Sequence, residues 1–216
     1  MKKGIIFDLD GTMWDSAEGV VKAWNEIISK AKDRDHLVTL EEMYGLMGKP
    51  MDEIEQLVFP NLQNPRRKEL MDLCCVRENE YLLAHGGILY PMLEQTLQTL
   101  SEEYELFIVS NCQIGYIEAF LDHYGFAHYF ADTENFGNTG KLKAYNISLV
   151  VERNKLDWAV YVGDTLGDYN STMEAGLPFI LAEYGFGEVT AAKYRADAFC
   201  ELPTLVEKVF LETGKK

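Results

Sequence analysis

Two aspartates stand two residues apart, directly after a short apolar run near the N-terminus. Residues 4–9 read Gly-Ile-Ile-Phe-Asp-Leu, and Asp10, Gly11 and Thr12 follow. If the strand continues to its tip, the side chains of Asp8 and Asp10 project on the same side, because side chains alternate along a strand. Carboxylates at this spacing could share a hard divalent cation, which prefers oxygen ligands. The alternative is a simple polar turn, since Asp and Gly are common in turns.

A second acidic group follows another apolar run much later in the chain. Asp164 comes at the end of residues 159–164, and Asp168 lies four residues on, where a helix is expected to begin. Asp168 could instead be a helix-capping residue and Asp164 a solvated loop residue. Parallel-sheet enzymes, however, build their sites beyond the carboxyl ends of strands. Three or four carboxylates meeting there would repel one another strongly without a cation.

Polar and basic side chains that could bind an anion complete the set. Ser110 and Asn111 end a third apolar run, where a hydroxyl and backbone amides could face phosphate oxygens as a helix begins. An ordinary helix N-cap is the alternative for this pair. Lys141 and Lys143 precede another expected helix, and either could supply positive charge in a strongly acidic chain.

The elements that must position these residues follow from hydrophobic patterning. Four short apolar runs, at residues 4–9, 106–110, 159–164 and 178–181, are typical of strands buried on both faces, and helical patterns separate the last three. This alternation predicts an α/β fold with a parallel sheet covered on both faces. Residues 13–104 contain no comparable run but several helical patterns, which predict an insertion of about three or four helices and then a helix starting at Met92.

Composition limits the classes of partner. The chain has 216 residues, 47% of them apolar, and a formal charge of -15. This charge argues against a nucleic-acid scaffold or an acidic lipid surface as partner. No apolar run is long enough for a membrane span, and the N-terminus lacks a signal-peptide pattern. We therefore expect a cytoplasmic protein with reduced cysteines, a monomer or weak homodimer that acts on a small molecule.

With these motifs in place, the chain resembles the haloacid dehalogenase superfamily, near its phosphoglycolate phosphatase-like branch. The matching segments occur in family order over the whole chain: Phe7–Thr12, Val109–Asn111, Lys141, and Val162–Thr165 with Asp168. One feature departs from the pattern, because Leu142 follows Lys141 where this branch usually has proline, and Lys143 competes for the role. The resemblance implies a three-layer, doubly wound parallel sheet formed by residues 1–14 and 86–216, with a helical cap at residues 15–85.

The resemblance also implies a chemistry: Mg²⁺-dependent hydrolysis of a small phosphomonoester, a phosphorylated metabolite, through an aspartyl phosphate. Asp8 would be the nucleophile and Asp10 the general acid and base. The implied metal site comprises Asp8, Asp10 through its carbonyl oxygen, Asp164 and Asp168, and the implied phosphate site comprises Gly11, Ser110, Asn111 and Lys141. In the cap, Lys49 could reach a second anionic group of the substrate, or be only a solvated loop lysine.

Other functions keep the same core residues. A phosphomutase of the β-phosphoglucomutase kind would differ only in its cap, and a phosphonate hydrolase would use a cap lysine, with Lys49 in a comparable loop, to form an imine. From a different class, a receiver-type phospho-switch also uses a phosphorylated aspartate, although such modules are shorter and have no cap. The sequence leaves the substrate open.

Overall fold

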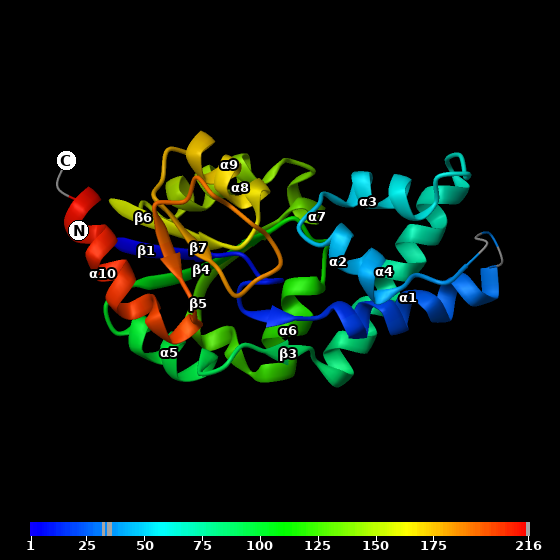
Figure 1. The fold of residues 1–216 in the computed structure, drawn as a ribbon, viewed down its shortest axis with the longest axis horizontal. Helices are drawn as coiled ribbons and strands as arrows, with labels where there is room; N and C mark the ends of the chain where they lie inside the picture. The colour runs from blue at the N-terminus through cyan, green and yellow to red at the C-terminus, as the bar shows by residue number, and fades with distance from the viewer. Residues whose placement is uncertain (32, 34–35, 215–216) are drawn as a thin grey trace.

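A six-stranded parallel sheet forms one end of the molecule (Figure 1). The computed structural model describes residues 1–31, 33 and 36–214. The strand order is β5-β4-β1-β6-β7-β8, and every neighbouring pair is parallel. The strands are β1 (Lys3–Phe7), β4 (Glu105–Ser110), β5 (Phe130–Asn135), β6 (Trp158–Gly163), β7 (Phe179–Ala182) and β8 (Tyr194–Ala196). The predicted fold class, an α/β three-layer parallel sheet, is confirmed.

Alternating side chains of the strands enter two separate cores, one on each face of the sheet. On β1, Ile5 and Phe7 pack with one core, which also contains Phe120 of a helix. Ile6 packs with the other core, together with Ile147. The covering helices are α5 (Leu93–Ser101), α6 (Tyr116–Tyr124) and α10 (Leu202–Thr213) for the first core, and α8 (Lys143–Arg153) and α9 (Leu166–Glu174) for the second. This arrangement explains why the central strands are apolar throughout.

Two strands of the six-stranded sheet, β5 and β8, were not predicted from the sequence. β5 lies at one edge of the sheet, and its sequence Phe-Ala-Asp-Thr-Glu-Asn is polar because much of it is only half-buried. β8 occupies the other edge and has only three residues. Neither segment carries the continuous apolar run that marks a strand covered on both faces.

Helices form the other end of the molecule (Figure 1). They are α1 (Ala17–Ala31), α2 (Leu40–Leu46), α3 (Met51–Val58) and α4 (Arg66–His85), in agreement with the predicted number of helices. We call residues 17–85 the helical segment. α1 and α4 lie side by side, joined by the hydrogen bond from Trp24 Nε1 to Glu78 Oε2 and by the ion pair of Arg77 with Glu26.

Two short strands connect the helical segment to the sheet. β2 (Trp14–Asp15) and β3 (Ile88–Leu89) pair antiparallel where the chain leaves and returns. Their two-residue length explains why no sequence pattern indicated them. α5 begins at Leu93, one residue after the predicted start at Met92. Within the described residues, no helix combines the length and the apolar character needed to cross a membrane. The assignment of residues 15–85 to a cap domain, separate from the sheet domain, stays a prediction.

Candidate active site

Three carboxylates from two strand ends meet at the carboxyl edge of the sheet. Asp8 follows β1 directly, and Asp164 follows β6, its immediate neighbour in the sheet. Asp168 lies in the first turn of α9. One oxygen of each residue can be chosen so that all three lie within 4.8 Å of one another, and all three side chains are buried. The structure thus brings together residues that lie up to 160 positions apart in the sequence, as the arrangement of parallel strands predicts.

The donor set fits a hard divalent cation such as Mg²⁺. Asp164 Oδ2 accepts a hydrogen bond from the Phe186 amide at 2.7 Å, whereas its Oδ1 is buried and has no hydrogen-bond partner. A buried carboxylate oxygen without a partner is costly, and a bound cation would satisfy it. Burial and the charges of Asp168 and Asp8 raise the pKa of Asp164 well above its ordinary value, which a cation would counteract.

The backbone of Gly11 approaches Asp164 so closely that only glycine fits at this position. Gly11 has φ +77°, in the left-handed region, and a Cβ placed there would lie 2.1 Å from Asp164 Oδ2. This contact explains the glycine in the Asp-Leu-Asp-Gly-Thr sequence. It also shows that the loop after β1 packs directly on the loop after β6.

Lys143, rather than Lys141, is the lysine of this site. Lys143 Nζ donates to Asp8 Oδ1 at 2.9 Å and to Asp168 Oδ1 at 2.5 Å, and its side chain is buried. Burial acts to lower the pKa of Lys143, but Asp168 and Asp8 outweigh it and hold the pKa well above its ordinary value. Lys141 is exposed. The physical reason for this correction is that α8 begins at Lys143, whose side chain points into the core, while Lys141 lies in the loop before the helix.

Asp168 has two structural roles at once. Its Oδ2 accepts from the Thr165 amide at 2.9 Å and from Thr165 Oγ1 at 2.7 Å, which completes a capping box at the start of α9. Its Oδ1 holds Lys143. The capping interpretation of Asp168 is therefore confirmed, and the same carboxyl group contacts Lys143. Metal binding by Asp168 stays a prediction.

Asp10 faces a different set of groups from the three clustered carboxylates. β1 ends at Phe7, so Asp10 does not continue the strand alternation that the sequence suggested. Asp10 Oδ1 accepts from Ser16 Oγ at 2.6 Å and from the Tyr116 hydroxyl at 2.7 Å. The side chain of Asp10 thus lies outside the carboxylate cluster, and a metal contact through its carbonyl oxygen stays a prediction.

Burial shifts the acidity of both aspartates of the first motif. Desolvation raises the pKa of Asp8 to about 7, although Lys143 acts to lower it. Desolvation likewise raises the pKa of Asp10 to about 6, against the lowering effect of the hydrogen bonds from Ser16 and Tyr116. A carboxyl group with a pKa near neutrality can both give and accept a proton, as general acid–base catalysis requires.

A small cavity lies above these residues, between the sheet and the helical segment. Its volume is about 50 Å³, and Asp8, Asp10, Ser110 and Asn111 line it from the sheet side. The Asn111 side-chain amide donates to the Gly48 carbonyl at 2.9 Å, which ties the helical segment to the sheet. The helical segment therefore covers the site closely in this structure.

Lys49 also lines the cavity, but its ammonium group has a partner. Lys49 Nζ lies 2.6 Å from Glu53 Oε1, one turn further along the chain, and both side chains are partly exposed. The structure shows no contact of Lys49 with the clustered carboxylates. A role in substrate selection stays a prediction.

Sequence reasoning missed three residues that complete the site: Ser16, Tyr116 and Glu78. Ser16 and Tyr116 hold Asp10 and also contact each other at 2.7 Å. Glu78 lines the cavity from α4. A signal for Glu78 exists, because it continues the buried stripe of α4 at four-residue spacing, with Leu70, Cys74 and Leu82.

The arrangement of motifs is matched by a known family. Residues 5–182 match the family model of the haloacid dehalogenase-like hydrolases. The chain belongs to this family. This match confirms the expected superfamily. It also confirms that the chain is an enzyme, a hydrolase of the phosphatase type.

Individual members of the haloacid dehalogenase-like hydrolases align over nearly the whole chain. A phosphoglycolate phosphatase of Rhodobacter capsulatus is 27% identical, in an alignment that covers 96% of this chain and 98% of that protein. A phosphoglycolate phosphatase of Xanthomonas campestris pv. campestris (strain 8004) is 25% identical over 208 residues, 93% of each chain. The crystal structure of a predicted phosphoglycolate phosphatase from Haemophilus somnus 129PT superposes with a TM-score of 0.83 at 19% identity, over 95% of this chain and 98% of that one. This last likeness shows the shared fold.

Proposed function

We propose that this protein is a Mg²⁺-dependent phosphatase that hydrolyses a small phosphomonoester through a phosphorylated Asp8. The observation that carries the proposal is the buried group formed by Asp8, Asp164, Asp168 and Lys143 at the end of β1 and β6. The group joins a carboxylate nucleophile, acids that would hold a metal and a cation beside a cavity that Asp8 lines. The relatives named above support the class of reaction.

Asp8 supplies the attacking oxygen in this mechanism. Its Oδ1 is held by Lys143, so Oδ2 is the atom we expect to attack phosphorus, with the bond to the leaving oxygen breaking on the opposite side. Lys143 keeps the carboxylate oriented and offsets negative charge as the phosphoryl group arrives. The aspartyl phosphate then forms within a space that the helical segment covers.

Asp10 moves the protons. With its pKa raised to about 6, the protonated carboxyl of Asp10 gives its proton to the departing alkoxide oxygen. The resulting carboxylate then takes a proton from the water that attacks the aspartyl phosphate, which releases inorganic phosphate and restores Asp8. Ser16 and Tyr116 fix the orientation of Asp10 for both steps through their hydrogen bonds to Oδ1.

Asp8, Asp164 and Asp168 are the residues that would hold Mg²⁺, with the free Oδ1 of Asp164 as the clearest donor. Bound there, Mg²⁺ would neutralise the charge that spreads over the phosphoryl oxygens. Ser110 and Asn111, at the end of β4, line the cavity and would bind phosphate oxygens. The expected contribution of Gly11 does not fit this structure, because its amide donates to the Trp14 carbonyl at 2.9 Å.

Residues 15–85 would act as a cap over this site. The cavity of about 50 Å³ is much smaller than a usual ligand pocket of roughly 300–1,000 Å³, so the cap must move to admit the substrate. Its closure excludes bulk water during the attack. The contact of Asn111 with Gly48 is one of those that would be broken and remade in each cycle.

Steady-state phosphate release tests the proposal. The wild-type chain should release phosphate continuously from p-nitrophenyl phosphate in the presence of Mg²⁺, and Asp8→Asn should abolish the release. Asp122→Asn, an exposed aspartate on α6, is the matched control and should retain full activity. A single stoichiometric phosphorylation without turnover, or an Asp8→Asn variant with wild-type rate, would contradict the proposed mechanism.

A further inference from the structure

Glu78 is a buried acid that the proposed reaction does not use. It lines the cavity from α4, on the side of the helical segment, and only 4% of its surface is exposed. It is one of the few polar groups on this wall, whose other residues include Val20, Trp24, Met43 and Ile54. A carboxyl group in such surroundings is retained only where it has partners or a ligand.

Two donors hold Glu78 without neutralising it. Trp24 Nε1 donates to Oε2 at 2.5 Å. The Gln113 side chain, whose Nε2 also donates to Asn79 Oδ1 at 3.0 Å, acts as the second donor and lowers the pKa of the same carboxyl group. A carboxylate has about four acceptor positions on its two oxygens. Two of these positions are therefore left for a further donor from the side of the cavity.

The cavity offers no buried cation for an anionic group on this wall. Among the described residues that line it, Lys49 is the one lysine or arginine, and its ammonium group is paired with Glu53. Asp10 adds a second acid nearby, since its charge acts to raise the pKa of Glu78. A substrate carboxylate placed here would meet two acids and no free cation.

A hydroxyl group fits this wall in either protonation state of Glu78. Burial raises the pKa of Glu78 to about 8, so the group changes between donor and acceptor in the neutral range. A hydroxyl can donate to the carboxylate and can also accept from the protonated form. A carboxylate can only accept, and it loses its partner once Glu78 is ionised.

We infer that Glu78 determines substrate class: it selects phosphomonoesters whose leaving group carries a hydroxyl, as in a polyol or sugar monophosphate, and disfavours those that carry a carboxylate. This inference rests on the proposed function and adds to it. It also sets this chain apart from relatives whose names give phosphoglycolate, a carboxylate, as their substrate.

A matched pair of two-carbon substrates tests the inference. 2-Hydroxyethyl phosphate and 2-phosphoglycolate differ only in the hydroxyl or carboxylate at the end remote from phosphorus. At pH 8.5 and saturating Mg²⁺, the wild type should have a kcat/KM for the hydroxyl substrate at least about tenfold above that for the carboxylate, the size expected for one hydrogen bond to a charged group. Glu78→Gln should reduce this ratio by about tenfold.

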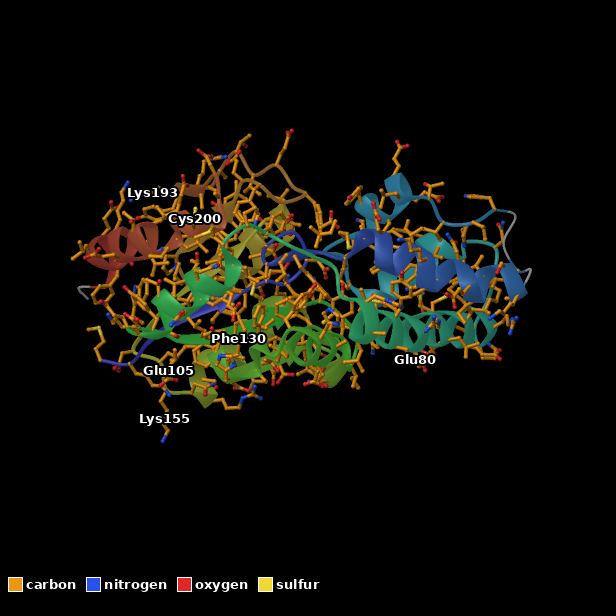
Figure 2. The ribbon with its side chains drawn as sticks, turned by 90° about the horizontal axis from the view of Figure 1, so that it is seen from below. Glu80, Glu105, Phe130, Lys155, Lys193 and Cys200 are labelled. Carbon is orange, nitrogen blue, oxygen red and sulfur yellow. The ribbon has the colours of Figure 1, made fainter. Side chains whose placement is uncertain are left out.

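The ratio separates selection from a structural effect. Distortion of the cap would lower kcat/KM for both substrates together and leave their ratio unchanged. Glu80→Gln, on the exposed side of the same helix, is the control and should leave the ratio at its wild-type value (Figure 2). If Glu78→Gln does not fold, Glu78→Met, which buries no polar group, gives the same comparison.

Two results would overturn the inference. One is a wild type that prefers 2-phosphoglycolate, and the other is a folded Glu78 variant whose ratio equals that of the wild type. Failure of the proposed function looks different, because the wild type would then release no phosphate from either substrate or from p-nitrophenyl phosphate.

Discussion

Lys143 and Asp8, separated by 135 positions in the sequence, form a buried ion pair with 2.9 Å between Nζ and Oδ1. The pair places a fixed positive charge beside the proposed nucleophile. Removal of this charge leaves Asp8 and Asp168 buried together without compensation, which is expensive for the folded state and for the reaction. This relationship gives the first prediction.

Lys143→Ala should reduce kcat by about 10²- to 10³-fold, the usual effect of deleting one group that stabilises transition-state charge. It should also lower the free energy of unfolding, because two buried carboxylates lose their partner. The nearby Lys141→Ala is the control and should affect neither quantity, since Lys141 is exposed. Activity assays and urea unfolding of both variants make the comparison. Loss of activity in Lys141→Ala but not in Lys143→Ala would assign the role to Lys141.

Mg²⁺ should stabilise the wild-type protein against heat, and Asp164→Asn should weaken this effect. A ligand at a hundredfold excess over its Kd stabilises a protein by about 2.7 kcal/mol. Without metal, Asp164→Asn should have a higher Tm than the wild type, because the substitution removes one of three clustered carboxylates that repel one another. The measurement is Tm in EDTA and in a series of Mg²⁺ concentrations. Equal shifts in both proteins would place the metal elsewhere.

Asp10→Asn should separate the two chemical steps. With p-nitrophenyl phosphate, whose leaving group needs no proton, Asp8 should still be phosphorylated, and about one equivalent of nitrophenolate should appear in a burst. Hydrolysis of the aspartyl phosphate should then be slower by about 10²- to 10⁴-fold, since the base is missing. Rapid-mix absorbance measurements would detect the burst. Steady turnover at the wild-type rate would exclude Asp10 as the base.

Stability should depend on pH in a way that Glu78 explains. Burial raises the pKa of Glu78 from 4.5 to about 8, while hydrogen bonds from Trp24 and Gln113 act to lower it and Asp10 acts to raise it further. The folded protein therefore binds this proton more tightly than the unfolded chain does, so the contribution is complete below pH 4.5 and is lost as the pH rises to 8. Glu78→Gln has no such proton to lose.

The wild type should therefore lose stability relative to Glu78→Gln between pH 5 and pH 9. Urea unfolding of the two proteins at pH 5, 7 and 9 gives the difference, in which the titrations common to both proteins cancel. A difference that stays constant with pH would mean that Glu78 keeps an ordinary pKa in the folded protein.

The sequence was sufficient for those parts of the site that follow strand ends. Asp8, Ser110 and Asp164 each come directly after an apolar run, and parallel strands bring such ends to one edge. The sequence could not decide which lysine contacts Asp8. Lys141 and Lys143 differ by two positions, and only the point at which α8 begins decides which of them faces the core.

The strands and the buried acid that the sequence did not predict were also missed for physical reasons. β5 is a polar edge strand and β8 is very short, so neither has the pattern of a buried strand. Glu78 was overlooked because an acid in a helix usually lies on the solvated side. Its burial depends on the packing of α4 against α1 and on Gln113, which comes from a distant part of the chain. The four-residue stripe of α4 could signal that Glu78 is buried, but the partners Trp24 and Gln113 come from distant parts of the chain.

The double use of Asp168 has a consequence for how the protein loses function. The same carboxyl group starts α9 and anchors the lysine beside the nucleophile. Fraying of the first turn of that helix would free Lys143 and disorder the reactive centre before the sheet itself is disturbed. Catalytic competence is thus tied to the integrity of one helical turn, and inactivation by mild denaturant should precede global unfolding.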